Sequence, residues 1–460
     1  MPRHISIIGG GFHGICSAYL LAKKGYKVSL IDTGKTLGGV MASVEKDGYI
    51  YDLGCHLFDN SYQELANLIK ELMSDRIVPH KTIYASILNG ITSTDTDNPN
   101  LASLGRRVSS DIFFEMVDAI LATRKMPASS LADQVEATFG PAAAKALNDV
   151  YHKKTRCSFE DLSSTVFDTI LPPRLYFLDN EVARFLKKHP DLDKLIAVEC
   201  MDDPLKLFGN RLDITKTDYR QFYPAERGMR GFCEQAEKKL IDCGVDIYKT
   251  TFCQAIDQDG QGCRLTLLDK DTEKSWHMAS DLVFWAGDVT KLSEILGGPE
   301  DIAAYNQPVP IVVFYFNLPA DQIGHYSYIN NFDRENLISR ISAPSNYGAA
   351  MAPKGMGYVC AEVTTRVGSD MWNDSEAQTE AIWQEILAMN FVAPDAHMPE
   401  AFILKTPVGY MLKKKGYKKA FQNFTAFAKQ TPNIYFPEHG SFSKANIFAD
   451  VAHIITALDH

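Results

Sequence analysis

The sequence lacks the residue patterns of a metal site and of a disulfide framework. Its nine cysteines lie scattered between positions 16 and 360 without a C-x-x-C pair, and no histidines cluster at the spacing of metal ligands. Reduced thiols in the cytoplasm are the simplest interpretation of such cysteine usage. We therefore expect a cytoplasmic protein that binds no metal.

Long apolar runs and an excess of basic charge are missing as well. No apolar segment reaches the roughly 20 residues that a membrane-spanning helix needs. Residues 5–8 read as a buried strand, which leaves no space before them for a cleaved signal peptide. The formal net charge of −10 disfavours a nucleic-acid partner, because clustered Lys and Arg hold such partners. We expect neither a membrane span nor bound nucleic acid, and the oligomeric state stays open.

The composition is that of a folded protein with more than one lobe. The chain has 460 residues, of which 45% are hydrophobic and 23% are charged. A single small core does not extend over such a length, so two or three lobes are expected. A small-molecule substrate would be bound where these lobes meet.

The N-terminal residues carry a nucleotide-binding pattern. An apolar strand pattern at residues 4–8 leads into Gly9, Gly11 and Gly14, which form G-x-G-x-x-G. A helical pattern follows, and a second strand over residues 27–31 ends at Asp32. The glycines permit a tight turn, the approach of a pyrophosphate and close packing of the helix on the strand, while the acidic residue suits ribose hydroxyls. This unit predicts a Rossmann-type domain that binds an ADP-containing cofactor.

Later segments favour FAD over NAD, since they resemble flavoproteins of the amine-oxidase superfamily. The motifs are TGKTLGGVMAS and DGYIYDLGCHLF after Asp32, and the segments 245–257, 280–289 and 431–455 further along the chain. The resemblance implies an FAD cofactor and an α/β fold. It also implies cofactor contacts from Gly9, Gly11, Phe12, His13, Gly14, Asp32, Thr33, Gly38, Gly39, Val40, Leu53, Gly54, His56, Phe252, Ala286, Gly287, Glu438, Gly440, Asn446 and Ile447.

The order of these segments predicts a discontinuous FAD-binding domain with an inserted α+β substrate domain. The FAD-binding domain is expected to comprise residues 1–80, 215–300 and 425–460. The substrate domain is expected to comprise residues 81–214, with helical patterns at 111–124, 131–139 and 142–151, and residues 301–424. The second of these stretches reads as strands, at 309–318, 326–331, 336–344 and 357–364.

Within the superfamily, several segments resemble the UDP-galactopyranose mutases. They are YDLGCHLF with its His56, FGPAAAKALNDVYHKKTRCSFEDLS, LPPRLYFLDNE and NLISRISAPSNY. By this resemblance Arg174 and Arg340 would hold a substrate diphosphate, because a planar guanidinium binds phosphate oxygens in pairs. Tyr328 or Tyr410 would donate a hydrogen bond to phosphate, and His56 would steady the flavin ring.

The sequence also departs from the mutase pattern. Glu438 and His439 stand where the mutases have Gly-Arg, and Phe442, Lys444 and Asn446 replace a tyrosine pair and an aspartate. Thr155 and Arg156 lie where a tryptophan is expected. These departures put the substrate in doubt, although the fold is expected to be the same.

Three functions remain open from the sequence. The first is mutase-like action of a reduced flavin on a nucleotide-linked sugar, for which no Ser-His-Asp machinery is needed. The second is an oxidoreductase of the amine-oxidase type that removes hydride from an amine, alcohol or ring carbon. The third is a non-catalytic protein that binds FAD or a partner. The sequence does not name the substrate, the electron acceptor or the pathway.

Overall fold

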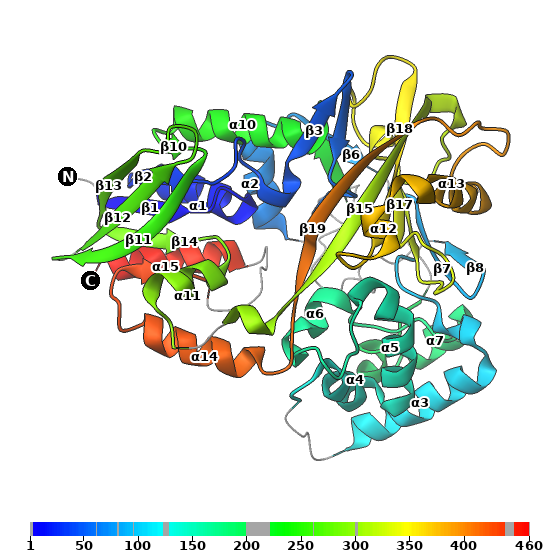
Figure 1. The fold of residues 1–460 in the computed structure, drawn as a ribbon. Coiled ribbons are helices and arrows are strands. Elements are labelled where there is room, and N and C mark those ends of the chain that lie inside the picture. The colour runs from blue at the N-terminus through cyan, green and yellow to red at the C-terminus, as the bar shows by residue number, and fades with distance from the viewer. Residues whose placement is uncertain are drawn as a thin grey trace.

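The structure is a computed structural model that describes residues 3–60, 62–80, 82–94, 96–122, 128–198, 221–260, 262–299, 302–437 and 446–459. Three groups of elements are visible in Figure 1: sheets with flanking helices on the side of both termini, a long-stranded sheet, and a cluster of helices. Along the chain the first group is interrupted twice by segments of the other two.

A five-stranded sheet forms the first group. Its order is β10 (Asp246–Tyr248), β2 (Lys27–Ile31), β1 (His4–Ile8), β14 (Leu282–Trp285) and β20 (Ile434–Tyr435), and all neighbours are parallel. Helix α1 (Phe12–Lys23) packs between α10 (Gly228–Asp242) and α15 (Ile447–Asp459). The three central strands β2, β1 and β14 are buried over most of their length and are mainly apolar, as expected of a parallel sheet covered by helices. The expected strand, turn, helix, strand unit at the N-terminus is confirmed.

The segment 245–257, which the sequence presents as one strand, belongs to two sheets. β10 joins the parallel sheet, whereas β11 (Thr251–Asp259) pairs with β12 (Gly262–Asp269), which pairs with β13 (Ser275–Ser280). The break falls at Thr250, whose φ of 50° is not a strand conformation. A run of β-forming residues cannot reveal such a break, because it depends on the partner strands.

A seven-stranded sheet forms the second group. Its order is β19 (Ala401–Lys413), β15 (Asn306–Pro319), β18 (Met356–Thr364), β17 (Arg340–Ser342), β16 (Tyr328–Asn331), β7 (Tyr84–Leu88) and β8 (Ile91–Thr94). The pairs are antiparallel except for β16 with β7. The four strands expected between residues 301 and 424 are confirmed. The sequence analysis missed β19 and the hairpin β7–β8, which comes from the stretch that was interpreted as helical.

The cluster of helices lies beside the end of this sheet at which β15 begins and β19 ends (Figure 1). It contains α3 (Arg106–Leu121), α4 (Leu131–Phe139), α5 (Pro141–Thr155), α6 (Phe167–Ile170), α7 (Asn180–Leu186) and α8 (Pro190–Asp193). Helix α4 begins with a capping box at Ser130 and Asp133, and Pro141 opens α5 at a position that needs no amide hydrogen. The three expected helices are therefore confirmed.

The remaining strands and helices lie between these groups or pack against one of them. They are β3 (Ser43–Lys46), β4 (Tyr49–Asp52), β5 (Phe58–Asp59), β6 (Ile77–His80), β9 (Gln221–Pro224), α2 (Gln63–Leu72), α11 (Val289–Leu296), α12 (Asp370–Asn373), α13 (Thr379–Ala388) and α14 (Tyr417–Ala428). The described residues contain no helix long and apolar enough to cross a membrane. The α/β class with a Rossmann-type sheet is confirmed, and the domain boundaries stay a prediction.

Candidate functional site

The glycine turn between β1 and α1 has the geometry of a phosphate cradle. Gly9 has a φ of 112°, and a Cβ there would lie 2.9 Å from the Gly287 nitrogen. A Cβ on Gly14 would overlap the Gly9 carbonyl oxygen, whereas a Cβ on Gly11 would meet no described atom within 4 Å. The turn is therefore closed on its protein side and open at Gly11, where α1 begins. Backbone N–H groups at such a helix N-terminus suit a pyrophosphate.

Asp32 lies at the carboxyl end of β2, next to this turn. Its Oδ2 accepts the Gly10 N–H at 2.6 Å, and its Oδ1 accepts the Gly34 N–H at 2.7 Å. Each carboxylate oxygen can accept a further hydrogen bond. The geometry therefore fits a carboxylate that braces the turn and still accepts ribose hydroxyls.

Phe12 and His13 direct their side chains into the protein. The Phe12 ring packs among Phe58 and Phe232, and His13 Nε2 lies 3.1 Å from Asp450 Oδ2 on α15. Both side chains are at least 94% buried. Any cofactor contact of these two predicted residues would therefore come from their backbone.

Several other predicted cofactor residues are apolar or glycine and lie in the loops after β2 and β4 and on β11. Gly38 forms a bridge with Gly11, and the neighbouring Val40 has a 66% exposed side chain. Leu53 is 37% exposed and Phe252 is 39% exposed, so both side chains are accessible to a ligand. Gly39 and Gly54 have positive φ values, and the Thr33 carbonyl accepts a hydrogen bond from Lys270. These residues fit the adenine and ring sides of a flavin dinucleotide.

The returning segments meet the glycine turn from the other side. Ala286 donates its N–H to the Ile8 carbonyl, which holds Gly287 beside Gly9. Ile447 is buried at the start of α15, directly after Asn446. The predicted contacts Glu438 and Gly440 lie outside the described residues.

A cavity of about 700 Å³ begins at these cofactor loops and ends among β17, β18, β19 and α5. Val40, Leu53 and His56 line its cofactor side. Its opposite wall includes Arg340, Glu362, Lys405, Tyr410 and Lys154. Among its described lining residues, three Lys or Arg side chains accompany one carboxylate, although the whole chain is acidic.

Arg340 and Glu362 face each other across β17 and β18. The guanidinium donates to both carboxylate oxygens, with Nε to Oε1 at 2.6 Å and Nη2 to Oε2 at 2.8 Å. Glu362 also accepts the Cys55 N–H at 3.2 Å, so the pair connects the substrate sheet to the loop before His56. Burial opposes the charge of Arg340, but Glu362 raises the pKa of the guanidinium. A bidentate pair of this kind fixes the direction of the remaining donors.

Lys154 enters the cavity from the last turn of α5. Its Nζ donates to Asn330 Oδ1 at 2.9 Å and lies 4.1 Å from the centre of the Phe332 ring. Tyr410 donates its hydroxyl to the Lys154 carbonyl and so holds the end of the helix. Burial, and after it the charge of Arg340, lower the pKa of Lys154 to about 7.

The structure brings three of the five predicted catalytic residues to this cavity. His56, Arg340 and Tyr410 line it, and His56 Nε2 lies 3.1 Å from the Leu53 carbonyl oxygen. Arg174 and Tyr328 are not among its described lining residues. Arg174 donates Nε to the Asp193 carbonyl at 2.6 Å, and the Tyr328 hydroxyl lies 3.3 Å from Asp97 Oδ2. The role of Arg174 and Tyr328 at the site stays a prediction. Neither side chain lines the cavity that contains Arg340.

The sequence analysis missed Lys154, Glu362 and Lys405. Lys154 follows another lysine at a helix end, where basic residues are common for reasons unrelated to catalysis. Glu362 is a different case, because it interrupts the apolar strand pattern of β18 and is only 6% exposed. A charged residue in such a strand was a usable signal for a buried ion pair.

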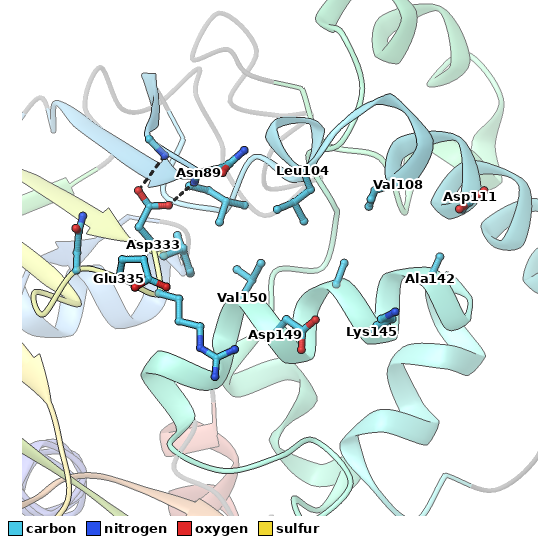
Figure 2. A pocket seen from close by; sticks show the side chains of 16 residues that line it. Asn89, Leu104, Val108, Asp111, Ala142, Lys145, Asp149, Val150, Asp333 and Glu335 are labelled. Atoms are coloured by element: carbon cyan, nitrogen blue, oxygen red, sulfur yellow. Dashed lines mark hydrogen bonds between the residues drawn. The ribbon is translucent and has the colours of Figure 1, made fainter.

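A second cavity, of about 680 Å³, uses another face of α5 (Figure 2). Helix α3 contributes Val108 and Asp111, while α5 contributes Lys145 and Asp149. Asp333 accepts the N–H groups of Asn89 and Gly90 at one end of this cavity. The described residues contain no group of three or more His, Cys, Asp or Glu side chains that could hold a metal ion.

Comparison with known proteins supports the interpretation of the N-terminal residues as a Rossmann-type nucleotide-binding unit. Residues 7–72 match the family described as the NAD(P)-binding Rossmann-like domain. The chain is also 37% identical over 87 residues to 4,4'-diaponeurosporene oxygenase from Staphylococcus aureus. That match covers 18% of this chain and 18% of the oxygenase, so the chain matches under a fifth of the length of such curated relatives.

Solved structures extend the similarity to the whole fold. The chain is similar to a reduced UDP-galactopyranose mutase, with a TM-score of 0.72, 16% identity and coverage of 100% of this chain and 94% of that one. A putative protoporphyrinogen oxidase from Exiguobacterium sp. 255-15 gives 0.66 at 15% identity, with full coverage of both chains. A putrescine oxidase gives 0.62 at 11% identity, again with full coverage of both. The expected amine-oxidase-type fold is therefore confirmed.

Proposed function

We propose that the protein is an FAD-dependent enzyme that acts on a nucleotide-linked sugar, with the flavin in its reduced state. The glycine turn, Asp32 and the exposed side of Phe252 would hold the ADP half of the cofactor, and Gly39, Val40, Leu53 and Gly54 would face its ring. The bound flavin supplies the redox-active ring, which no side chain can provide. The fold shared with UDP-galactopyranose mutase and two oxidases supports a flavoenzyme.

The charge of the 700 Å³ cavity is the observation that favours a nucleotide-linked sugar as the substrate. Among the described lining residues, Lys154, Arg340 and Lys405 stand with a single carboxylate, Glu362, which is already hydrogen-bonded to Arg340. Such a wall attracts an anion, and a sugar diphosphate has the required charge. A protonated amine would be repelled by the same groups. If the protein is instead an oxidoreductase, this repulsion disfavours an amine as its substrate. An alcohol or a ring carbon as the site of hydride removal stays compatible with the charge of the cavity.

The function is tested on purified protein in the oxidised and dithionite-reduced states. We expect a flavin absorbance, stabilisation of the protein by a UDP-, dTDP- or GDP-sugar in a thermal-shift screen, and conversion of the stabilising sugar by the reduced form only. Turnover by the oxidised form with stoichiometric peroxide would favour the oxidoreductase instead. Protein that binds no flavin would support the non-catalytic alternative.

A matched pair of variants distinguishes the cavity from the rest of the surface. Arg340→Met removes a guanidinium from the cavity wall, and Arg76→Met removes one that is 54% exposed beside Glu226. We expect the first variant to lose stabilisation by the nucleotide sugar and the second to keep it. Equal responses of the two variants would contradict binding at this cavity.

A further inference from the structure

The arrangement of cations around Asn330 suggests how the cavity selects its ligand. Asn330 pairs with Arg340 in the register of β16 and β17, and its Oδ1 accepts the Lys154 ammonium. Both cationic side chains line the cavity and adjoin the same residue. Glu362 is the one carboxylate among the described lining residues, and Arg340 occupies both of its oxygens. Lys154 is therefore held by a neutral amide and an aromatic face.

We propose that Lys154 determines specificity for an anion by taking up a proton when a substrate diphosphate binds in contact with it and Arg340. This inference rests on the proposed function, since it concerns the nucleotide-linked sugar of the same cavity. The proton comes from solvent, forms a third N–H bond on Nζ, and returns to solvent when the anion leaves. No other bond is made or broken in this step.

The electrostatics of the free cavity support this coupling. Burial and the charge of Arg340 lower the pKa of Lys154 to about 7, and Lys153 acts in the same direction. Glu362 and Asp97 act in the opposite direction but do not compensate. An anion placed among these cations offsets the repulsion from Arg340 and attracts the charged form of Lys154, so its binding raises that pKa. Proton uptake and anion binding are then linked in both directions.

Charged and polar groups surround Lys154 from several elements. They are Lys153 on α5, Asp97 in the loop after β8, Asn330 on β16, Arg340 on β17, Glu362 on β18, and Lys405 and Tyr410 on β19. Lys153 donates to the carbonyl oxygens of Asp333 and Ile338, and Lys405 donates to that of Trp372, so their ammonium groups have main-chain partners. The pKa of Tyr410 is raised by burial, away from neutrality. Burial lowers the pKa of Lys153 only to about 8, compared with about 7 for Lys154, and His56 lines the same cavity from the loop after β4. Variants of Lys154 separate its charge from that of these two neighbours.

The binding experiment uses UDP-galactose and the oxidised holoenzyme, in which no turnover is expected. The diphosphate of this probe has no proton to lose between pH 6 and 9, so a pH dependence reports on the protein. For the unchanged chain we expect the dissociation constant to rise up to about tenfold per pH unit above pH 7. Calorimetry in buffers of different ionisation enthalpy is expected to detect uptake of up to about one proton per ligand at pH 8.

Variants assign the effect to Lys154. Lys154→Arg keeps a permanent charge, so its affinity is expected to stay constant from pH 6 to 9 without proton uptake. Lys154→Met is expected to bind at least about tenfold more weakly at pH 6, again without pH dependence. Lys145→Met is the matched control, because Lys145 extends from the same helix into the second cavity (Figure 2). It should behave as the unchanged protein does.

Each outcome decides the inference. Binding with pH-independent affinity and no proton uptake overturns the role of Lys154 and leaves the proposed function intact. If the affinity of Lys154→Arg still depends on pH, the proton is taken up by another group, such as His56. This result also overturns the proposed role of Lys154. Failure of the unchanged holoenzyme to bind UDP-galactose at any pH between 6 and 9 overturns the proposed function and this inference together. Because Lys154→Arg keeps a positive charge on a long side chain, the test does not depend on Lys154→Met folding.

Discussion

Separating Arg340 from Glu362 should cost far more than separating a surface ion pair. The Glu362 side chain is 8% exposed, whereas that of Arg340 is 35% exposed. In the variant Arg340→Met the nearly buried carboxylate loses its two charged donors. In the variant Glu362→Gln the partly exposed guanidinium keeps access to water and one amide oxygen. The two substitutions should therefore have unequal effects on stability.

The magnitudes follow from this difference in exposure. Removing one partner of a buried ion pair costs about 3–5 kcal/mol, so Arg340→Met is expected near that range. Glu362→Gln is expected to cost about 1–2 kcal/mol, because the orphaned guanidinium is partly exposed and the Cys55 N–H keeps an acceptor. The double variant should cost less than the sum by about 1–3 kcal/mol, since no unpaired charge remains.

The measurement is a double-mutant cycle of urea unfolding followed by tryptophan fluorescence at neutral pH. Arg76→Met provides the surface control, because the side chains of Arg76 and Glu226 are 54% and 60% exposed. Its loss of stability should stay within about 0.5 kcal/mol. Additive losses of unfolding free energy for Arg340→Met and Glu362→Gln would refute the inference that Arg340 stabilises the buried carboxylate of Glu362. Equal losses for the two single variants would also refute it.

Two further predictions concern the cofactor loops. Gly14→Ala should abolish flavin binding and lower the melting temperature, because its Cβ would overlap the Gly9 carbonyl oxygen. Gly297→Ala is the control, at a φ of 65° with open space around it. It should lower the free energy of unfolding by about 1–2 kcal/mol and leave the flavin content unchanged. Burial raises the pKa of the Cys55 thiol to about 11, so at pH 8 iodoacetamide should modify exposed Cys243 well before Cys55, as followed by peptide mass spectrometry. Flavin retained in Gly14→Ala, or equal labelling of the two cysteines, would contradict the respective prediction.

Elements with strong local patterns were predictable from the sequence. The helix over residues 131–139 matches α4, and the strand over 4–8 matches β1. β19 was missed because its residues are mostly half-exposed and include Pro407 and Gly409, which are uncommon inside strands. Its strand conformation comes from pairing with β15 along nearly its whole length. Such pairing stabilises a strand whose own sequence does not favour one.

The sequence alone determined the nucleotide-binding turn. Gly9, Gly11, Gly14 and Asp32 lie within one short strand, turn, helix, strand unit, whose geometry follows from local sterics and hydrogen bonds. The charged cavity was decided only by the tertiary structure. Lys154 comes from a helix far before the two strands of Arg340 and Glu362 in the chain, and each of the three residues taken alone is an ordinary charged residue. Sheet pairing and the docking of α5 bring them together, and burial then changes their electrostatics in a way that no local pattern encodes.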